Sequence, residues 1–329
     1  MKLHENRQLF EQAIDATVDE FGIYPEFVEK DYWICHILQN LSRMEKEALC
    51  VWKGGTSIAK AYGLINRFSS DVDIALLSEQ LSQNQQKKLV AKIGHESTLG
   101  LIENENAGTI KNNRFRKTYH SYESVIKNSN GHLDFLGTHV IVEINTYGNS
   151  YPYERRRVTS FITEMMQRRG LNEVSVEYDM APFELNVLDK RRTMCEKIVS
   201  LLRFSFSDNP IEGLSSKIRN FYDLHFMSMD EDCREYLKNE FPSNLMELIA
   251  HDKAEFDRPP HWKDADLTAS VLFTFLDETW EKLASTYKSE LGRLTYGALP
   301  TPDEIASSIC PLMEYVKNIV SKQSIQSII

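Results

Sequence analysis

Residues 53–75 constrain the fold more than any other part of the chain, because they place two acidic side chains in an apolar segment soon after a glycine pair. Asp71 and Asp73 alternate with Val72 and Ile74, and side chains two apart on a β-strand point to the same face. The apolar pair then enters a core while the carboxylates share the opposite face. This pattern predicts a strand whose two carboxylates suit a hard cation such as Mg²⁺ or Mn²⁺.

The turn before this strand suits a phosphate group. Gly54 and Gly55 allow close approach of the backbone to an anion, and the N–H groups of the following helix would point at it. Thr56 and Ser57 are expected to add hydroxyl hydrogen bonds. Each of the two features also has a simpler interpretation. The glycine turn on its own is compatible with an ordinary helix cap, and the acidic pair on its own with a solvated strand edge. With 48 acidic residues in 329, chance alone gives about seven acidic pairs at this spacing. The prediction of a phosphate and metal site therefore depends on the glycine turn being followed by the acidic pair.

Composition excludes several other kinds of site. The five cysteines form no CxxC pair and the nine histidines no HExxH spacing, which argues against a zinc site or a disulfide framework. Any metal is therefore expected on oxygen ligands. The net charge of -10 argues against nucleic-acid binding over the whole surface. The chain shows no secretory signal and no apolar run of membrane-spanning length, so we expect a cytoplasmic protein with no membrane contact.

Periodicity predicts an α+β fold: a mixed sheet flanked by helices, followed by a mostly helical C-terminal domain. The composition changes near residue 188, which predicts domains at 1–188 and 189–329. Predicted strands lie at 49–52, 72–77, 111–119 and 133–145. Predicted helices lie at 3–20, 26–43, 57–62, 80–94, 189–202, 212–227, 231–238, 245–256, 267–283 and 303–320.

The segment KGGTSIAKAYGLINRFSSDVDIAL resembles the first motif of the AbiEii/AbiGii toxin family, which includes the MenT-like toxins and belongs to the nucleotidyltransferase beta superfamily. The resemblance is dense over residues 26–77 and extends weakly to about residue 226. It includes an N-terminal signature at residues 29–32, EKDY. The resemblance implies a nucleotidyltransferase-like fold and a nucleoside triphosphate on the turn at residues 54–57, with Lys53, Lys60 and Arg67 as further nucleotide contacts.

Three later residues match the family as site residues. Glu143, in an apolar strand, corresponds to the superfamily's third carboxylate and is expected as a third metal ligand or as a base for the attacking hydroxyl; the alternative is a solvent-facing position. Lys197, in the segment EKIVSLLR, matches the EKxxALxxR helix and is expected to reach the triphosphate. Asp223 lies in KIRNFYDL, which resembles the RDxYD segment but has Asn220 where the family has Asp. The helical domain would thus contribute Lys197 and Asp223 to the site.

The family implies a metal-dependent toxin of a type IV toxin-antitoxin system that transfers a nucleoside monophosphate from a nucleoside triphosphate to an acceptor, with a cognate antitoxin protein as partner. By analogy with the MenT-like toxins the acceptor is tRNA. Basic clusters with aromatic neighbours, at residues 111–117, 155–157 and 168–169, are candidate RNA contacts. The alternatives are a solvated strand and loop, or a surface for an acidic protein. Two alternatives remain: a small-molecule nucleotidyltransferase, and a catalytically weak binding module, which Asn220 favours.

Overall fold

The computed structural model describes residues 1–44, 49–77, 80–126, 136–146 and 150–326. The chain forms two compact units. One comprises residues 1–63 and 68–189, and the other comprises residues 64–67 and 190–329. Among the described residues, no helix has the length and apolar character needed to cross a membrane.

The first unit is built on a mixed sheet with the strand order β3-β5-β6-β2-β1-β8-β7, and β4 pairs with β5 beside this path. β1 runs parallel to β8, and β2 runs parallel to β6, whereas the other neighbours are antiparallel. β2 therefore lies in the middle of the sheet. The strands are β1 (Cys50–Lys53), β2 (Asp71–Leu76), β3 (Ile102–Asn104), β4 (Ile110–Lys111), β5 (Phe115–Ser121), β6 (His139–Asn145), β7 (Tyr153–Val158) and β8 (Phe183–Leu188).

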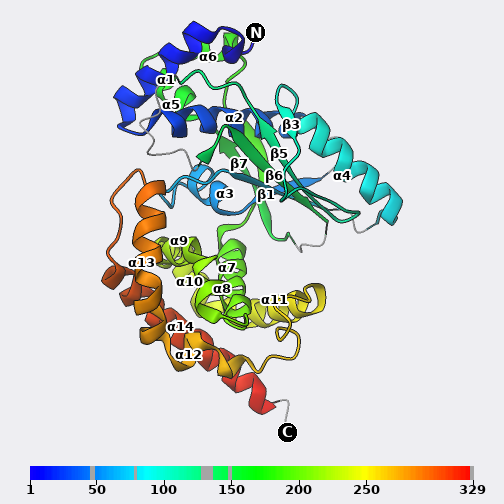
Figure 1. Cartoon of the computed structure of the whole chain (residues 1–329), viewed down its shortest axis with the longest axis vertical. Helices are drawn as coiled ribbons and strands as arrows, with labels where there is room; N and C mark the ends of the chain where they lie inside the picture. The colour runs from blue at the N-terminus through cyan, green and yellow to red at the C-terminus, as the bar shows by residue number, and fades with distance from the viewer. Residues whose placement is uncertain (45–48, 78–79, 127–135, 147–149, 327–329) are drawn as a thin grey trace. The chain divides into compact units, whose positions relative to one another are not determined.

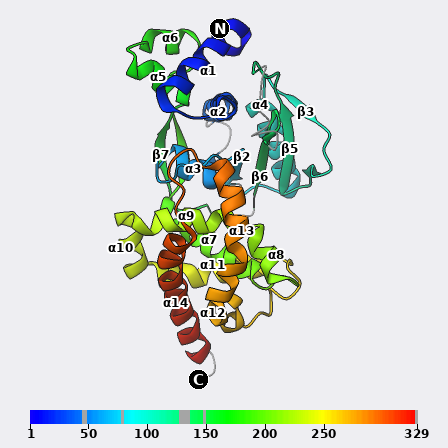
Figure 2. The ribbon, with the colours of Figure 1, turned by 60° about the vertical axis from the view of Figure 1, so that its left-hand side comes forward.

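Helix α2 is the core helix of this unit, and it packs against α1, α4 and α5 as well as against β6 and β8. Figures 1 and 2 both show α2 between α1 and the sheet. It begins with Pro25 at its first turn, a position that needs no N–H donor. The helices of the unit are α1 (Arg7–Phe21), α2 (Pro25–Arg43), α3 (Gly55–Lys60), α4 (Gln83–Ser97), α5 (Phe161–Arg168) and α6 (Asn172–Glu177).

Three successive charged residues of α2, Glu29, Lys30 and Asp31, are each no more than 2 % exposed. Side chains that follow one another on a helix point in different directions, so each contacts a different segment. Glu29 accepts a hydrogen bond from the Val125 backbone N at 2.7 Å, and Lys30 donates to the carbonyl of Leu136. Asp31 pairs with a cation of α3. The three charges thereby connect α2 to the backbone at residues 125 and 136 and to helix α3, and each has the partner that a buried charge requires.

The second unit is helical. Figure 2 shows its two long C-terminal helices, α13 and α14, side by side. α7 packs against α9, α10 and α11. The elements of this unit are α7 (Lys190–Phe204), α8 (Pro210–Ser215), α9 (Ile218–Met229), α10 (Glu231–Asn239), α11 (Phe241–Glu255), the 3₁₀ turn η3 (Leu267–Ala269), α12 (Val271–Thr274), α13 (Leu276–Leu294) and α14 (Pro302–Gln326).

Three predicted elements are divided in the structure. The predicted helix 212–227 is two helices, because α8 ends at Ser215 and α9 begins at Ile218. The other two are divided where a side chain bonds to the backbone. The predicted strand 111–119 is split because Asn112 Oδ1 accepts hydrogen bonds from the backbone N–H groups of Arg114 and Phe115, which makes a turn. The predicted helix 267–283 is split because the side chain of Ser270 caps a new helix by accepting from the Leu272 backbone N. Residues 133–135 of the predicted strand 133–145 lie outside the described residues.

Candidate active site

The glycine turn and the first carboxylates meet in space. Gly54 has φ 87° and ψ -169°, a conformation that is essentially restricted to glycine. A Cβ atom at this position would lie 2.2 Å from Oδ2 of Asp73. The Asp73 carboxylate therefore lies directly against the Gly54 backbone, and the residue at position 54 must be glycine both for its backbone conformation and for the space that the carboxylate occupies.

A row of four charged side chains crosses the sheet at Asp73. In the strand register Lys53 of β1 is opposite Asp73, Asp73 is opposite Glu143 of β6, and Glu143 is opposite Lys117 of β5. Register partners in a sheet share a face, so these four side chains lie on one side of it. Asp71 lies on the same face two residues earlier. The structure thus brings the three predicted carboxylates to one surface of the first unit.

The neighbouring β2 residues confirm the predicted alternation. Val72 and Ile74 are fully buried, whereas Asp71 and Asp73 are of intermediate exposure. Ser70 Oγ donates a hydrogen bond of 3.2 Å to Asp71 Oδ1. Apolar side chains on one face and carboxylates on the other are what the sequence of this strand predicts.

Glu143 is engaged by a cation. Lys117 Nζ lies 2.8 Å from Glu143 Oε1. Burial alone would lower the pKa of Lys117, but the hydrogen bond and charge of Glu143, with smaller contributions from Tyr119 and Asp71, raise that pKa above its ordinary value. The Lys117 ammonium therefore stays charged at neutral pH.

The donor set fits a divalent cation held by two carboxylates. Mg²⁺ is commonly bound by one or two carboxylates, with waters and substrate phosphates completing the octahedron, and Asp71 and Asp73 provide such a pair on one face. In the described part of the chain, no group of three or more Asp, Glu, His or Cys side chains has the geometry to hold a metal. The role of Glu143 as a third ligand therefore stays a prediction.

Lys30 of α2 is a charged residue near this site to which the sequence pattern assigns no role. It is 1 % exposed. Burial lowers its pKa to about 8, and the charges of Asp71 and Glu29 oppose that shift. The signal in the sequence is helical spacing: Phe27, Trp33 and Ile34, which are three or four residues from Lys30, are apolar and predict that this side of the helix is buried.

The hydroxyl groups of the turn are used internally. Thr56 Oγ1 donates to the carbonyl of Asp71 at 2.7 Å, and Ser57 Oγ donates to the carbonyl of Gly54 at 2.8 Å. Both side chains are buried. These bonds hold the turn against the start of β2, and a phosphate at the turn would take its hydrogen bonds mainly from backbone N–H groups, including that of Gly55. Nucleotide binding by the two hydroxyls stays a prediction.

Lys60 is the cation that pairs with Asp31. Its Nζ lies 2.5 Å from Asp31 Oδ1 and 4.5 Å from the centre of the Phe161 ring. Burial opposes the charge of Lys60, but Asp31 and its other acidic neighbours outweigh burial and raise the pKa of Lys60. In this arrangement Lys60 links α3 to α2, and its contact with a nucleotide stays a prediction.

The remaining predicted site residues form a second group, which belongs to the helical unit. Asp223 is fully buried. Its two carboxylate oxygens accept hydrogen bonds of 2.6 Å from Nε and a terminal nitrogen of Arg67, and Lys197 Nζ lies 2.7 Å from Asp223 Oδ2. Burial would raise the pKa of Asp223, but the two cations lower it below its ordinary value. Lys197 also donates to Asn220 Oδ1 at 3.5 Å.

Arg67 belongs to this second group because residues 64–67 are counted with the helical unit. Arg67 forms an isolated β-bridge with Thr295, and the backbone N of Tyr296 donates to the carbonyl of Asn66 at 3.0 Å. The structure therefore gathers the predicted residues in two groups, one in each unit, and their combination in one site stays a prediction.

Several of the predicted RNA-contacting cations lie beside carboxylates. Lys111 and Arg116 contact Glu103 at 2.5 Å and 2.9 Å, and Arg155 lies 3.7 Å from Glu184. Arg157, on the edge strand β7, is exposed. RNA binding by these clusters stays a prediction.

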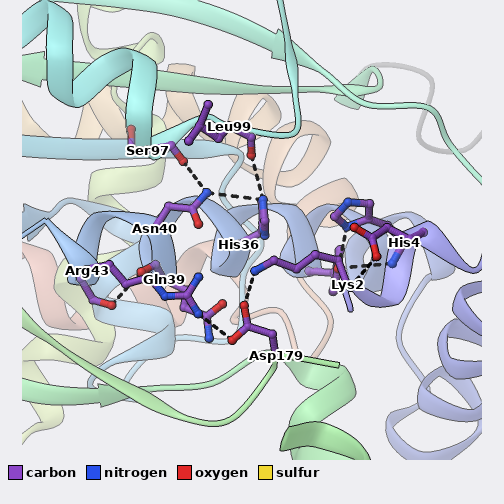
Figure 3. Close-up of polar contacts among 12 residues, drawn as sticks. Lys2, His4, His36, Gln39, Asn40, Arg43, Ser97, Leu99 and Asp179 are labelled. Carbon is purple, nitrogen blue, oxygen red and sulfur yellow. Dashed lines mark hydrogen bonds and ion pairs between the residues drawn. The ribbon is translucent and has the colours of Figure 1, made fainter. Parts of the chain in front are cut away.

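A cavity at the N-terminus is distinct from both groups. Residues of α2, of the β7–α5 junction and of the loop before β8 line it, and they include none of the predicted site residues. Figure 3 shows Lys2 and Arg43 both reaching the Asp179 carboxylate, with Arg43 at 2.6 Å. Here His36 contacts the carbonyl of Leu99 at 2.9 Å. These contacts fasten the N-terminus to α2 and to the loop before β8.

Comparison with known proteins identifies the family. A sequence profile described as "Nucleotidyl transferase AbiEii toxin, Type IV TA system" matches residues 36–306. The chain belongs to the AbiEii family. The match covers the glycine turn, the row of charges and the Asp223 group, so both groups of predicted site residues lie inside the AbiEii region. The chain is accordingly a nucleotidyltransferase of a toxin family, and a type IV system implies an antitoxin as partner.

Solved structures with a similar chain include two nucleotidyltransferases. A putative nucleotidyltransferase from H. pylori aligns with 15 % identity and a TM-score of 0.45, covering 92 % of this chain and 99 % of its own. MenT4, a nucleotidyltransferase toxin from Mycobacterium tuberculosis H37Rv, aligns with 13 % identity and a TM-score of 0.44, covering 90 % of this chain and 94 % of its own. Among curated proteins, none matches this AbiEii-family sequence significantly.

Proposed function

We propose that this AbiEii-family protein is a metal-dependent toxin that transfers a nucleoside monophosphate from a nucleoside triphosphate to RNA, with tRNA as the acceptor. The observation that carries the proposal is the Asp73 carboxylate seated against Gly54, with Asp71 and Glu143 on the same face of the sheet. Carboxylates beside a glycine turn supply both a metal site and space for the phosphates that the metal must contact.

In the proposed reaction a hydroxyl oxygen of the acceptor attacks the α-phosphorus of the nucleotide. The bond from that phosphorus to the α–β bridging oxygen breaks, and pyrophosphate leaves with the electron pair. A bound Mg²⁺ or Mn²⁺ would neutralise charge on the phosphates and polarise the phosphorus–oxygen bonds. Asp71 and Asp73 would hold this cation. Glu143 would act as a third ligand or accept the proton of the attacking hydroxyl.

The helical unit would take part in nucleotide binding. Lys197 supplies a positive charge that would offset the charge of the triphosphate, as positioned cations do in phosphoryl transfer. Asp223 contacts the Lys197 ammonium, and Arg67 in turn holds the Asp223 carboxylate. Lys53, opposite Asp73 in the register, provides a further cation on the carboxylate face. A cytoplasmic location follows from tRNA as acceptor.

Transfer is tested with α-labelled nucleoside triphosphates, Mg²⁺ or Mn²⁺ and total tRNA. Label is expected in tRNA with the wild type, and at least about 100-fold less with Asp73→Asn, because a lost metal contact removes several kcal/mol of transition-state stabilisation. Asp15→Asn makes the same chemical change at an exposed position of α1 and is expected to transfer at the wild-type rate. Expression of the wild type and of Asp15→Asn should arrest growth, whereas expression of Asp73→Asn should not.

Three results would overturn parts of the proposal. Equal transfer by the wild type and Asp73→Asn would show that the carboxylate is not used. Label in a small molecule but not in RNA would indicate a small-molecule nucleotidyltransferase. Tight nucleotide binding with no transfer to any acceptor would indicate a binding module, and Asn220→Asp would then show whether this position accounts for the missing activity.

A further inference from the structure

The third carboxylate of the row has two neighbours that compete for it. Glu143 lies between Asp73 on β2 and Lys117 on β5 in the strand register. Directly opposite side chains in a sheet have Cβ atoms about 5 Å apart, so a glutamate can extend toward either neighbour. In the structure the Glu143 carboxylate contacts Lys117 at 2.8 Å, and the described residues form no metal-binding group of three or more side chains.

Charge explains why Glu143 pairs with Lys117. Asp71, Asp73 and Glu143 lie on one face, and like charges on neighbouring strands repel each other. Contact with the Lys117 ammonium removes that repulsion for Glu143. A divalent cation on Asp71 and Asp73 would reverse this balance, because a positive charge would then lie on the β2 side of Glu143 as well.

We propose that Lys117 is a positioning residue that holds Glu143 away from the metal centre, and that Glu143 exchanges Lys117 for the metal when Asp71 and Asp73 bind a divalent cation. This inference rests on the proposed function, since it concerns the same carboxylates. The side chains of Lys117 and Glu143 are 27 % and 26 % exposed. Both side chains keep contact with water, so separating them costs less than separating a buried pair, and a bond to the metal would offset that cost.

The exchange has a consequence for the order of binding. The site has two carboxylate ligands before a cation arrives and three afterwards, so the metal is held more firmly once Glu143 has moved. The Lys117 ammonium is released at the same moment on the carboxylate face, within reach of a phosphate group brought by the metal. Lys117 thus couples metal binding to the appearance of a positive charge beside the substrate.

The test is a titration of the full chain with Mn²⁺ in the absence of nucleotide. Electron paramagnetic resonance measures the concentration of free Mn²⁺ and so gives the affinity. Lys117→Met is expected to tighten Mn²⁺ binding about two- to fivefold, because Glu143 no longer has to leave an ion pair. In a Glu143→Gln background the same substitution is expected to change the affinity much less. Lys117→Arg, which can keep the pair, should bind like the wild type.

A control separates this effect from a general loss of positive charge. Lys111→Met removes the same charge from the neighbouring strand β4, where the lysine pairs with Glu103 and not with Glu143. It is expected to leave the Mn²⁺ affinity within about 1.5-fold of the wild type, since the Lys111 side chain is 49 % exposed and salt screens exposed charges. Thermal unfolding without metal verifies that each variant is folded, and Lys117→Gln replaces Lys117→Met if that variant is not.

The outcomes distinguish this inference from the proposed function. Binding that depends on Asp73 but is unchanged by Lys117→Met would overturn the role of Lys117 and leave the metal centre in place. An equal gain in the Glu143→Gln background would overturn it too, because the effect would not pass through Glu143. Absence of Mn²⁺ binding in the wild type and in every variant would overturn both.

Discussion

Replacement of Gly54 by alanine tests the contact between the glycine turn and the carboxylate strand. The added Cβ would lie 2.2 Å from Asp73 Oδ2, whereas Cβ atoms in real structures essentially never approach a heavy atom closer than 3.0 Å. The obstacle is the carboxylate end of a side chain, so Asp73 must turn away or the turn must shift. The predicted result is an Asp73 carboxylate displaced by about 1 Å, a change of the size that costs catalysis about 100-fold.

The backbone adds a cost to stability. A non-glycine residue with the φ and ψ of Gly54 is strained by about 1–3 kcal/mol, which for a chain of this size lowers the melting temperature by several degrees. Gly54→Ala should therefore show a modest loss of thermal stability together with a loss of about 100-fold in nucleotidyl transfer and a weaker Mn²⁺ affinity. Circular dichroism, the labelled transfer assay and Mn²⁺ titration measure these three quantities.

Gly22→Ala separates the two effects. Gly22 caps α1 with φ 66° and ψ 28°, and a Cβ there would meet nothing within 4 Å. This substitution carries a backbone cost of about 1–2 kcal/mol with no displaced neighbour, so it should lower the melting temperature while transfer stays within about twofold of the wild type. Equal transfer by Gly54→Ala and Gly22→Ala would show that the contact between Gly54 and Asp73 does not position the carboxylate for transfer.

Two further predictions concern buried charges. Burial lowers the pKa of Lys30 to about 8, so above that pH the unfolded chain binds more protons than the folded chain. Between about pH 7.5 and 9.5 the free energy of unfolding should therefore rise by about 2 kcal/mol more in the wild type than in Lys30→Met. An equal rise in both proteins, measured by urea unfolding, would contradict this. Asp223→Asn leaves the Arg67 and Lys197 charges buried without a carboxylate, so it should cost about 3–5 kcal/mol of unfolding free energy. A loss below about 1 kcal/mol would show that water reaches the group.

Local patterns predicted the parts of the site that depend on neighbours in sequence. Strand alternation gave the common face of Asp71 and Asp73, and the turn chemistry gave the position of Gly54. The place of Glu143 opposite Asp73 depends on the pairing of β2 with β6, and a single sequence does not specify which strands pair or in what register.

The local sequence patterns did not predict the long-range ion pairs. Lys60 and Arg67 lie in the same stretch as the glycine turn, which suggested one shared role in nucleotide binding. In the structure Lys60 pairs with Asp31 and Arg67 with Asp223. Each partner is far away in sequence, and the spacing of charges along the chain contains no signal for such contacts. The same reason explains why Lys117 was assigned to a basic cluster and not to Glu143.

The position of residues 64–67 has a consequence for how the protein can be divided. The backbone passes between the two units at 63/64, at 67/68 and at 189/190, so no single cut separates them. A fragment ending at residue 189 would contain Arg67 and the buried Ile65 without the helical unit that encloses them, and a fragment beginning at residue 190 would contain Asp223 without Arg67. The two units are therefore expected to be made, folded and degraded as one molecule.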